Sequence, residues 1–283
     1  LPTVATIAYG LSASRHFPLL FQIGVGVYLI TAGILLSAHA IAHERATSPE
    51  RIPGDSPKQW FKKQGLPTIL AVLFLTGIFF SFGVHRLGLY AAVDEPLWLY
   101  GRIGSYWKNI GDGEFFKTDV SDKPGITVSM LSGAALLQYD PDDYDDWRRD
   151  GEVFHRQGMA EFFAAFRFPI VLAAALFLPI FYFLLDRLMG RSGALLSYAF
   201  LATSPILVGV TKIINPDAIL WIFVPLSILA YLVFQRRQAY LYLFLSGIFL
   251  GLGLLTKYIA NILFIYLLGL IFLEFLYRPK AAI

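Results

Sequence analysis

The chain contains no cysteine, which excludes disulfides, thiolate catalysis and cysteine metal sites. It also has few charges, since Asp, Glu, Lys and Arg make up 15% of its 283 residues while hydrophobic residues make up 57%. A soluble domain averages about 25% charged residues, so a large soluble core is not expected. The net charge of +3 is small. Its cations are dispersed between apolar runs, which argues against a nucleic-acid partner.

The motifs of several common enzyme sites are missing as well. The chain has no glycine-rich phosphate loop of the Walker or dinucleotide type. It has no local signature of a Ser/His/Asp triad. Only His39 and His43 lie four residues apart, and placement at the end of a membrane span explains them better than zinc. None of these motifs therefore competes with the charged residues described below as a candidate site.

The hydrophobic residues are gathered in continuous runs that are long enough to cross a bilayer as helices. They lack the alternation that a membrane barrel requires. We therefore expect an all-α polytopic membrane protein with about seven transmembrane helices. The expected spans are 17–41, 66–87, 167–186, 192–211, 217–235, 239–255 and 258–277.

The connectors between these spans predict which side of the membrane each one faces. Residues 43–65 carry five cations, which favours the cytoplasmic side. The short basic connectors further along the chain alternate correctly with that assignment. We divide the chain into an N-terminal extra span with its cytoplasmic connector, residues 1–65, and a transmembrane module, residues 66–283, with a long outer loop at 88–166. That loop would face the periplasm, the extracellular space or a lumen, from a plasma membrane or an ER-type membrane.

Two parts of the outer loop have distinct compositions. Residues 126–138 are apolar but too short to span, so we expect a helix that lies at the interface or dips back into the membrane. Residues 139–150 are rich in Asp. They form either a solvated acidic loop or a site for a divalent cation.

Charged residues collect at the expected outer ends of the helices. They are Asp94, Glu95, Arg102, Lys123, Lys212, Asp217 and Lys257. A charge at a helix end is costly unless it is paired, snorkelling or functional. Together they suit a phosphate-bearing substrate, because cations neutralise phosphate oxygens and a carboxylate can take a proton from an attacking hydroxyl. The alternative is a set of salt bridges that fix the helix ends, and the residues alone leave both readings open.

Four short motifs follow one another in order along the outer face. They are Val93-Asp94-Glu95-Pro96-Leu97-Trp98 with Arg102, Asp122-Lys123-Pro124-Gly125, Ile214-Asn215-Pro216-Asp217-Ala218 and Gly253-Leu254-Leu255-Thr256-Lys257-Tyr258. The ordered set resembles the GT-C fold glycosyltransferases that use polyprenyl-phosphate sugars, including protein O-mannosyltransferases and lipid A aminoarabinose transferases. The resemblance covers roughly residues 66–277, which suggests the N-terminal membrane part of such an enzyme.

The resemblance implies a reaction and a role for each matched residue. The enzyme would move a sugar from a dolichyl-phosphate-mannose-like or other polyprenyl-phosphate donor to an acceptor hydroxyl of a protein, lipid or glycan, with inversion. Asp94 would be the catalytic base, supported by Glu95 and Arg102. Lys123 and Lys257 would lie near the lipid phosphate, and Asp217 would be a second acidic residue near the site. Lys212 lies outside the four motifs, and its charge and its expected place at the outer face make it a further candidate for phosphate binding. The resemblance leaves metal use open, so a divalent cation is neither required nor excluded.

Two other classes of protein compete with this interpretation. Members of the family are usually longer, so the chain could be a non-catalytic membrane subunit or scaffold of the same fold, or could need a membrane partner that completes it. A transporter fits less well, because transporters place ionisable groups near the bilayer midplane. Here the charges are expected at the outer ends.

Overall fold

The computed structural model describes residues 64–121, 123–149 and 158–277. These residues form helices and no strands. The chain divides into two compact units, one of residues 52–260 and one of residues 1–51 with 261–283. The predicted separation of residues 1–65 from the rest lies mostly outside the described residues and stays a prediction.

Three helices in the described part of the chain are long and apolar enough to cross a membrane. They are α4 (Leu66–Val84), α9 (Met159–Ala202) and α11 (Asp217–Arg237). The apolar helix α12 (Tyr240–Thr256) is shorter. The helical, membrane-type fold expected from the sequence is therefore confirmed, while the number of seven spans stays a prediction. The first expected span, residues 17–41, lies outside the described residues.

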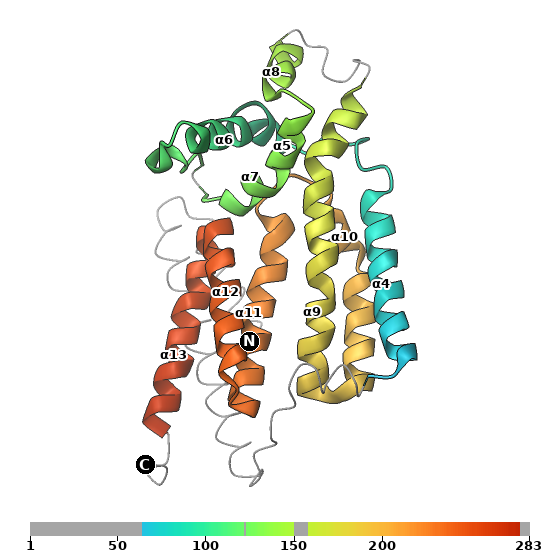
Figure 1. The fold of residues 1–283 in the computed structure, drawn as a ribbon, viewed down its shortest axis with the longest axis vertical. Coiled ribbons are helices and arrows are strands. Elements are labelled where there is room, and N and C mark those ends of the chain that lie inside the picture. The colour runs from blue at the N-terminus through green and yellow to red at the C-terminus, as the bar shows by residue number, and fades with distance from the viewer. Residues whose placement is uncertain (1–63, 122, 150–157, 278–283) are drawn as a thin grey trace, which may run out of the picture. The chain divides into compact units, whose positions relative to one another are not determined.

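Helix α9 contains a reversal rather than one continuous rod. A straight helix of its 44 residues would be about 66 Å long. At Gly190 the backbone takes φ 78° and ψ 171°, a conformation that glycine adopts without steric cost. Tyr182 and Tyr198, equally far from Gly190 in sequence, face each other with ring centroids 6.0 Å apart. The expected spans 167–186 and 192–211 are thus the two arms of a helical hairpin, which Figure 1 shows turning back beside α4.

The second arm of that hairpin ends in a short helix, α10 (Pro205–Thr211). Ser204 caps α10, because its Oγ accepts a hydrogen bond from the backbone N–H of Leu207. Helix α11 then begins after the connector 212–216, so this connector lies at the same end of the helices as the outer loop (Figure 1).

Buried aromatic rings and one pair of serines join the long helices. Trp221 of α11 stacks on Phe181 of α9 with ring centroids 6.2 Å apart. Between α11 and α12, Ser227 Oγ donates to the carbonyl of Ser246, and Ser246 Oγ donates to the carbonyl of Ser227, each at 2.9 Å. Reciprocal bonds of this kind satisfy polar groups inside an apolar bundle and fix the register of the two helices.

The outer loop folds into short helices at one end of α9, α11 and α12 (Figure 1). They are α5 (Glu95–Leu97), the π-helical turn η1 (Trp98–Arg102), α6 (Ile103–Gly111), the 3-10 turn η2 (Phe115–Lys117), α7 (Ile126–Ser132), the 3-10 turn η3 (Gly133–Leu137) and α8 (Pro141–Arg149). The helix expected at 126–138 therefore exists as α7 and η3. It packs against α6, α9 and α12, and its position at a membrane interface stays a prediction.

Helix α13 (Asn261–Tyr277) belongs to the second unit. It is a further apolar helix, in the region expected as the last span. Between it and α12 lie Lys257 and the 3-10 turn η4 (Tyr258–Ala260). Lys257 is thus the first residue beyond α12, at the end where the outer loop lies.

Candidate functional site

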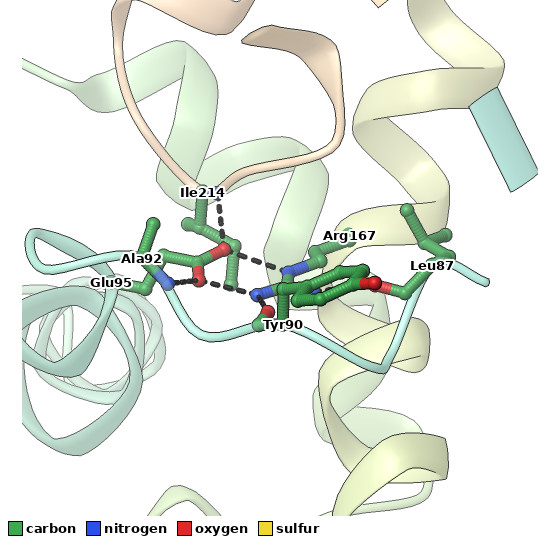
Figure 2. A network of polar contacts seen from close by, with 6 residues as sticks. All are labelled: Leu87, Tyr90, Ala92, Glu95, Arg167 and Ile214. Carbon is green, nitrogen blue, oxygen red and sulfur yellow. Dashed lines mark hydrogen bonds and ion pairs between the residues drawn. The ribbon is translucent and has the colours of Figure 1, made fainter. Parts of the chain in front are cut away.

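Glu95 is the buried centre of the outer loop. Its side chain is fully buried, and Figure 2 shows its carboxylate between two separate parts of the chain. Oε1 accepts hydrogen bonds from Arg167 Nε at 2.7 Å and from the backbone N–H of Ile214 at 2.8 Å. Oε2 accepts from the N–H of Ala92 at 2.8 Å and forms a close ion pair with Arg167 Nη2. Each oxygen of this carboxylate therefore accepts from two donor groups.

Arg167 of α9 completes the same network. Its guanidinium also donates to the carbonyls of Leu87 and Tyr90 and lies over the ring of Phe163. Arg167 therefore ties the segment after α4 to α9, while Glu95 ties that segment to the connector before α11 (Figure 2). Breaking one member of such a pair leaves an uncompensated buried charge. The Glu95–Arg167 pair consequently fixes the position of its neighbours.

Asp94 differs from its neighbour Glu95 in its exposure to solvent. It is exposed at the start of α5, and its Oδ2 lies 3.3 Å from Asn215 Nδ2 in the connector. An exposed carboxylate on a rigid backbone can accept a proton from a molecule that comes from solvent. The two adjacent acidic residues thus differ in what they can do, because only Asp94 is accessible.

Asp217 and Lys257 form the other half of the site. Lys257 Nζ lies 2.7 Å from Asp217 Oδ1 and 2.9 Å from Oδ2, and both side chains keep partial exposure. The N–H of Asp217 donates to Asn215 Oδ1 at 2.9 Å. Asp94, Asn215, Asp217 and Lys257 therefore form one chain of polar contacts, drawn from the outer loop, the start of α11 and the residue after α12.

A second link brings the segment around Lys123 to the same place. The N–H of Gly125 donates to the carbonyl of Thr256 at 3.0 Å, and the hydroxyls of Thr127 and Thr256 lie 2.7 Å apart. Thr256 directly precedes Lys257. The segment that carries Lys123 is consequently attached to the end of α12 through the backbone of Gly125, two residues further along the chain.

Arg102 reaches this region through Trp98. Its guanidinium lies 4.9 Å from the centroid of the Trp98 ring, a cation–π contact. That ring lies against Gly125, where an added Cβ would fall 2.1 Å from Trp98 Cη2. Gly125 also has φ 61°, so this position suits glycine on two counts.

Lys212 contacts the segment that follows α4. Its Nζ donates to the carbonyl of His85 at 2.6 Å, just beyond α4. Burial, and then the positive charge of Arg167, lower the pKa of the Lys212 ammonium. The structure thus brings Asp94, Asp217 and Lys257 into one set of contacts and places Lys212 toward α4.

Sequence reasoning missed two residues of this arrangement. Arg167 is a charge close to the start of an apolar run, a signal that a buried partner exists, but that partner cannot be named from the sequence. Asn215 belongs to a recognised motif without an assigned role, and only the structure places it between Asp94 and Asp217.

A cation site was left open for the Asp-rich stretch. Residues 141–149 of that stretch form α8, where Tyr144 stacks on Phe162 with ring centroids 5.9 Å apart. Within the described ranges, no three His, Asp or Glu side chains gather as metal ligands do. The sequence left the use of a divalent cation open, and no observation of the described residues tests it.

Comparison with known proteins gives one match. Residues 159–281 match the sequence profile of the family described as Dolichyl-phosphate-mannose-protein mannosyltransferase. No curated protein and no solved structure matches the chain. The apolar helices indicate an integral membrane protein, and its residues 159–281 are similar to a family of membrane glycosyltransferases.

The matched region contains only part of the candidate site. Arg167, Lys212, Asp217 and Lys257 lie within residues 159–281, whereas the outer-loop residues up to Lys123 lie before it. The match therefore includes Asn215 but not Asp94, the outer-loop residue that Asn215 contacts.

Proposed function

We propose that this protein is a membrane glycosyltransferase that moves a sugar from a polyprenyl-phosphate donor to an acceptor hydroxyl. The observation that carries the proposal is the polar chain Asp94–Asn215–Asp217–Lys257. It offers an accessible carboxylate in the outer loop and a lysine ammonium at the end of the apolar helix α12. In this proposal, both groups lie where the phosphate of the lipid-linked donor meets the hydroxyl of the acceptor.

Asp94 is the general base in this proposal. It takes the proton of the acceptor hydroxyl as the hydroxyl oxygen attacks the anomeric carbon of the donor sugar. The bond between that carbon and the phosphate oxygen breaks, and polyprenyl phosphate leaves with the electron pair. One displacement of this kind inverts the anomeric configuration.

The cations stabilise the leaving phosphate. Lys257 is oriented by both oxygens of Asp217, which holds the ammonium in place before the donor binds. Lys123 and Arg102 are attached to the same region through Gly125 and Trp98, and Lys212 adds a positive charge on the side of α4. Fixed positive groups of this kind stabilise charge that develops on a phosphate.

Glu95 acts through its neighbours in this mechanism. It is buried and accepts hydrogen bonds from Arg167, Ala92 and Ile214, so it cannot receive a proton from the acceptor without breaking that network. We assign it the role of holding Asp94 and the connector before α11 at a fixed spacing.

The proposed reaction takes place on the periplasmic, extracellular or lumenal side of the membrane. The acceptor is a hydroxyl of a protein, lipid or glycan, and a membrane partner could complete the acceptor site. The distribution of cations between the predicted spans supports this orientation.

The test uses the whole chain in its native membranes. These are supplied with a panel of radiolabelled polyprenyl-phosphate sugars, and the transferred sugar is then released for analysis of its anomeric configuration. We expect transfer from at least one donor, with inversion. Donor binding without transfer in the presence of native partners would favour a non-catalytic subunit, and retention of configuration would contradict a single displacement.

A further inference from the structure

Asn215 contacts Asp94 and Asp217, but the reaction described above assigns it no role. Its side-chain Oδ1 accepts a hydrogen bond from the backbone N–H of Asp217 at 2.9 Å. Because a backbone N–H can only donate, this bond fixes which end of the amide is the oxygen. The Nδ2 end must then face Asp94, whose Oδ2 lies 3.3 Å away.

The backbone on both sides of Asn215 is held rigidly. On one side, the N–H of the buried Ile214 donates to Glu95 at 2.8 Å. On the other side, the carbonyl of Asn215 accepts from the N–H of Ala218 at 2.9 Å, in the first turn of α11. The amide therefore sits on a frame whose position is set by buried contacts, which is what a positioning group requires.

We propose that Asn215 is a positioning residue for Asp94, an inference that rests on the function proposed above. Its N–H holds one carboxylate oxygen, Oδ2, and leaves the other to accept the proton of the attacking hydroxyl. Its side-chain oxygen, Oδ1, accepts from the N–H of Asp217 and so fixes the first turn of α11, from which Asp217 orients Lys257. One amide thereby sets the spacing between the base and the cation that faces the phosphate.

An amide suits this position because the two contacts need a donor and an acceptor at once. An aspartate could still accept from the N–H of Asp217, but it would set a second carboxylate against Asp94. A serine could also accept from that N–H, but it has no second polar atom to reach Asp94. The two substitutions therefore keep the helix start and change only what faces the base.

Several charged groups surround this position and must stay constant in a test by pH. On its own segment Asp94 is followed by Glu95, which is paired with Arg167 of α9. The connector and α11 contribute Lys212 and Asp217, and the end of α12 contributes Lys257. None of these is altered in Asn215→Asp or Asn215→Ser.

The first measurement is the pH dependence of sugar transfer by the whole chain in native membranes. A second carboxylate opposes ionisation of the first, so in Asn215→Asp we expect the acid limb of the profile to move to higher pH by about one unit. In Asn215→Ser we expect kcat to fall on the order of tenfold with KM unchanged. A purely structural role would lower activity without moving the acid limb.

The second measurement does not depend on turnover. A carbodiimide with glycine ethyl ester modifies protonated carboxyls, and mass spectrometry gives the fraction modified at Asp94 as a function of pH. We expect half-modification at higher pH in Asn215→Asp than in the wild type, and no change in Asn109→Asp, a matched substitution in α6. Unchanged labelling and an unchanged acid limb in Asn215→Asp would overturn the role of Asn215 while leaving the glycosyltransferase intact. A labelling shift in a chain that transfers no sugar would instead overturn the function and, with it, the positioning role in catalysis.

Discussion

At the scale of single residues, two adjacent carboxylates lie in opposite environments. Glu95 is fully buried among four donors, and Asp94 is exposed beside Asn215. The difference is set by the backbone around them, since the N–H groups of Ala92 and Ile214 both point at Glu95. A sequence can suggest that an Asp-Glu pair belongs to a functional site. Which of the two residues is buried depends on a hydrogen bond from a connector more than a hundred positions away.

Replacing Glu95 by Gln should destabilise the protein strongly. The substitution leaves the Arg167 guanidinium buried without its counter-charge, which costs about 3–5 kcal/mol. Thermal unfolding in detergent measures the loss. Glu114→Gln is the matched control, because Glu114 pairs with Lys117 at 2.8 Å on the surface, and such pairs contribute about 0–1 kcal/mol. Equal, small effects of the two substitutions would show that the buried network does not hold the loop.

At the scale of elements, the site depends on how the outer loop is fastened to the end of α12. The contact relies on Gly125, whose left-handed backbone lets its N–H reach Thr256 while the Trp98 ring covers it. The sequence predicted a helix after Pro124, and α7 is present. Its attachment to α12 could not be predicted, because it depends on a close approach between residues far apart in the chain.

Replacing Gly125 by Ala should disturb the site more than the same change at another left-handed glycine. The new Cβ would lie 2.1 Å from Trp98 Cη2, so the ring, and with it Arg102, must move. We expect the free energy of unfolding to fall by about 2–4 kcal/mol, because overpacking and the left-handed backbone both disfavour alanine. We also expect reduced sugar transfer. Gly113→Ala is the control, because Gly113 has φ 73° and open space around its Cβ position. If the two variants had the same unfolding temperature, the contact between Gly125 and Trp98 would not contribute to stability.

At the scale of the whole molecule, helix ends from several parts of the chain meet at one site. The alternation of short connectors predicted that Lys212, Asp217 and Lys257 would share one end of the bundle, and the structure of residues 64–260 agrees. This could be foreseen because a membrane helix must cross completely, so each connector returns the chain to a known side. The contacts within that end, including those of Arg167 and Asn215, depend on side-chain directions that no periodicity encodes.

Membrane sidedness can be tested cleanly because the chain has no cysteine. Phe116 in the outer loop and Tyr240 at the start of α12 are both exposed side chains, and they lie at opposite ends of the helices. In intact cells we expect Phe116→Cys to react with a membrane-impermeant maleimide. Tyr240→Cys should react only after permeabilisation. The reverse pattern would place the candidate site on the cytoplasmic side and contradict the proposed orientation.

The central claim is that Asp94 is the base of a sugar transfer from a polyprenyl phosphate. Its most direct test is single-turnover transfer of radiolabelled sugar by Asp94→Asn in native membranes, since the amide keeps the shape of the side chain and cannot take the proton. Asp119→Asn, which changes another exposed carboxylate of the same loop, is the control. We predict that transfer falls by about 10²–10⁴-fold in Asp94→Asn, with donor binding retained and the control unchanged. Transfer at the wild-type rate by Asp94→Asn would contradict the claim.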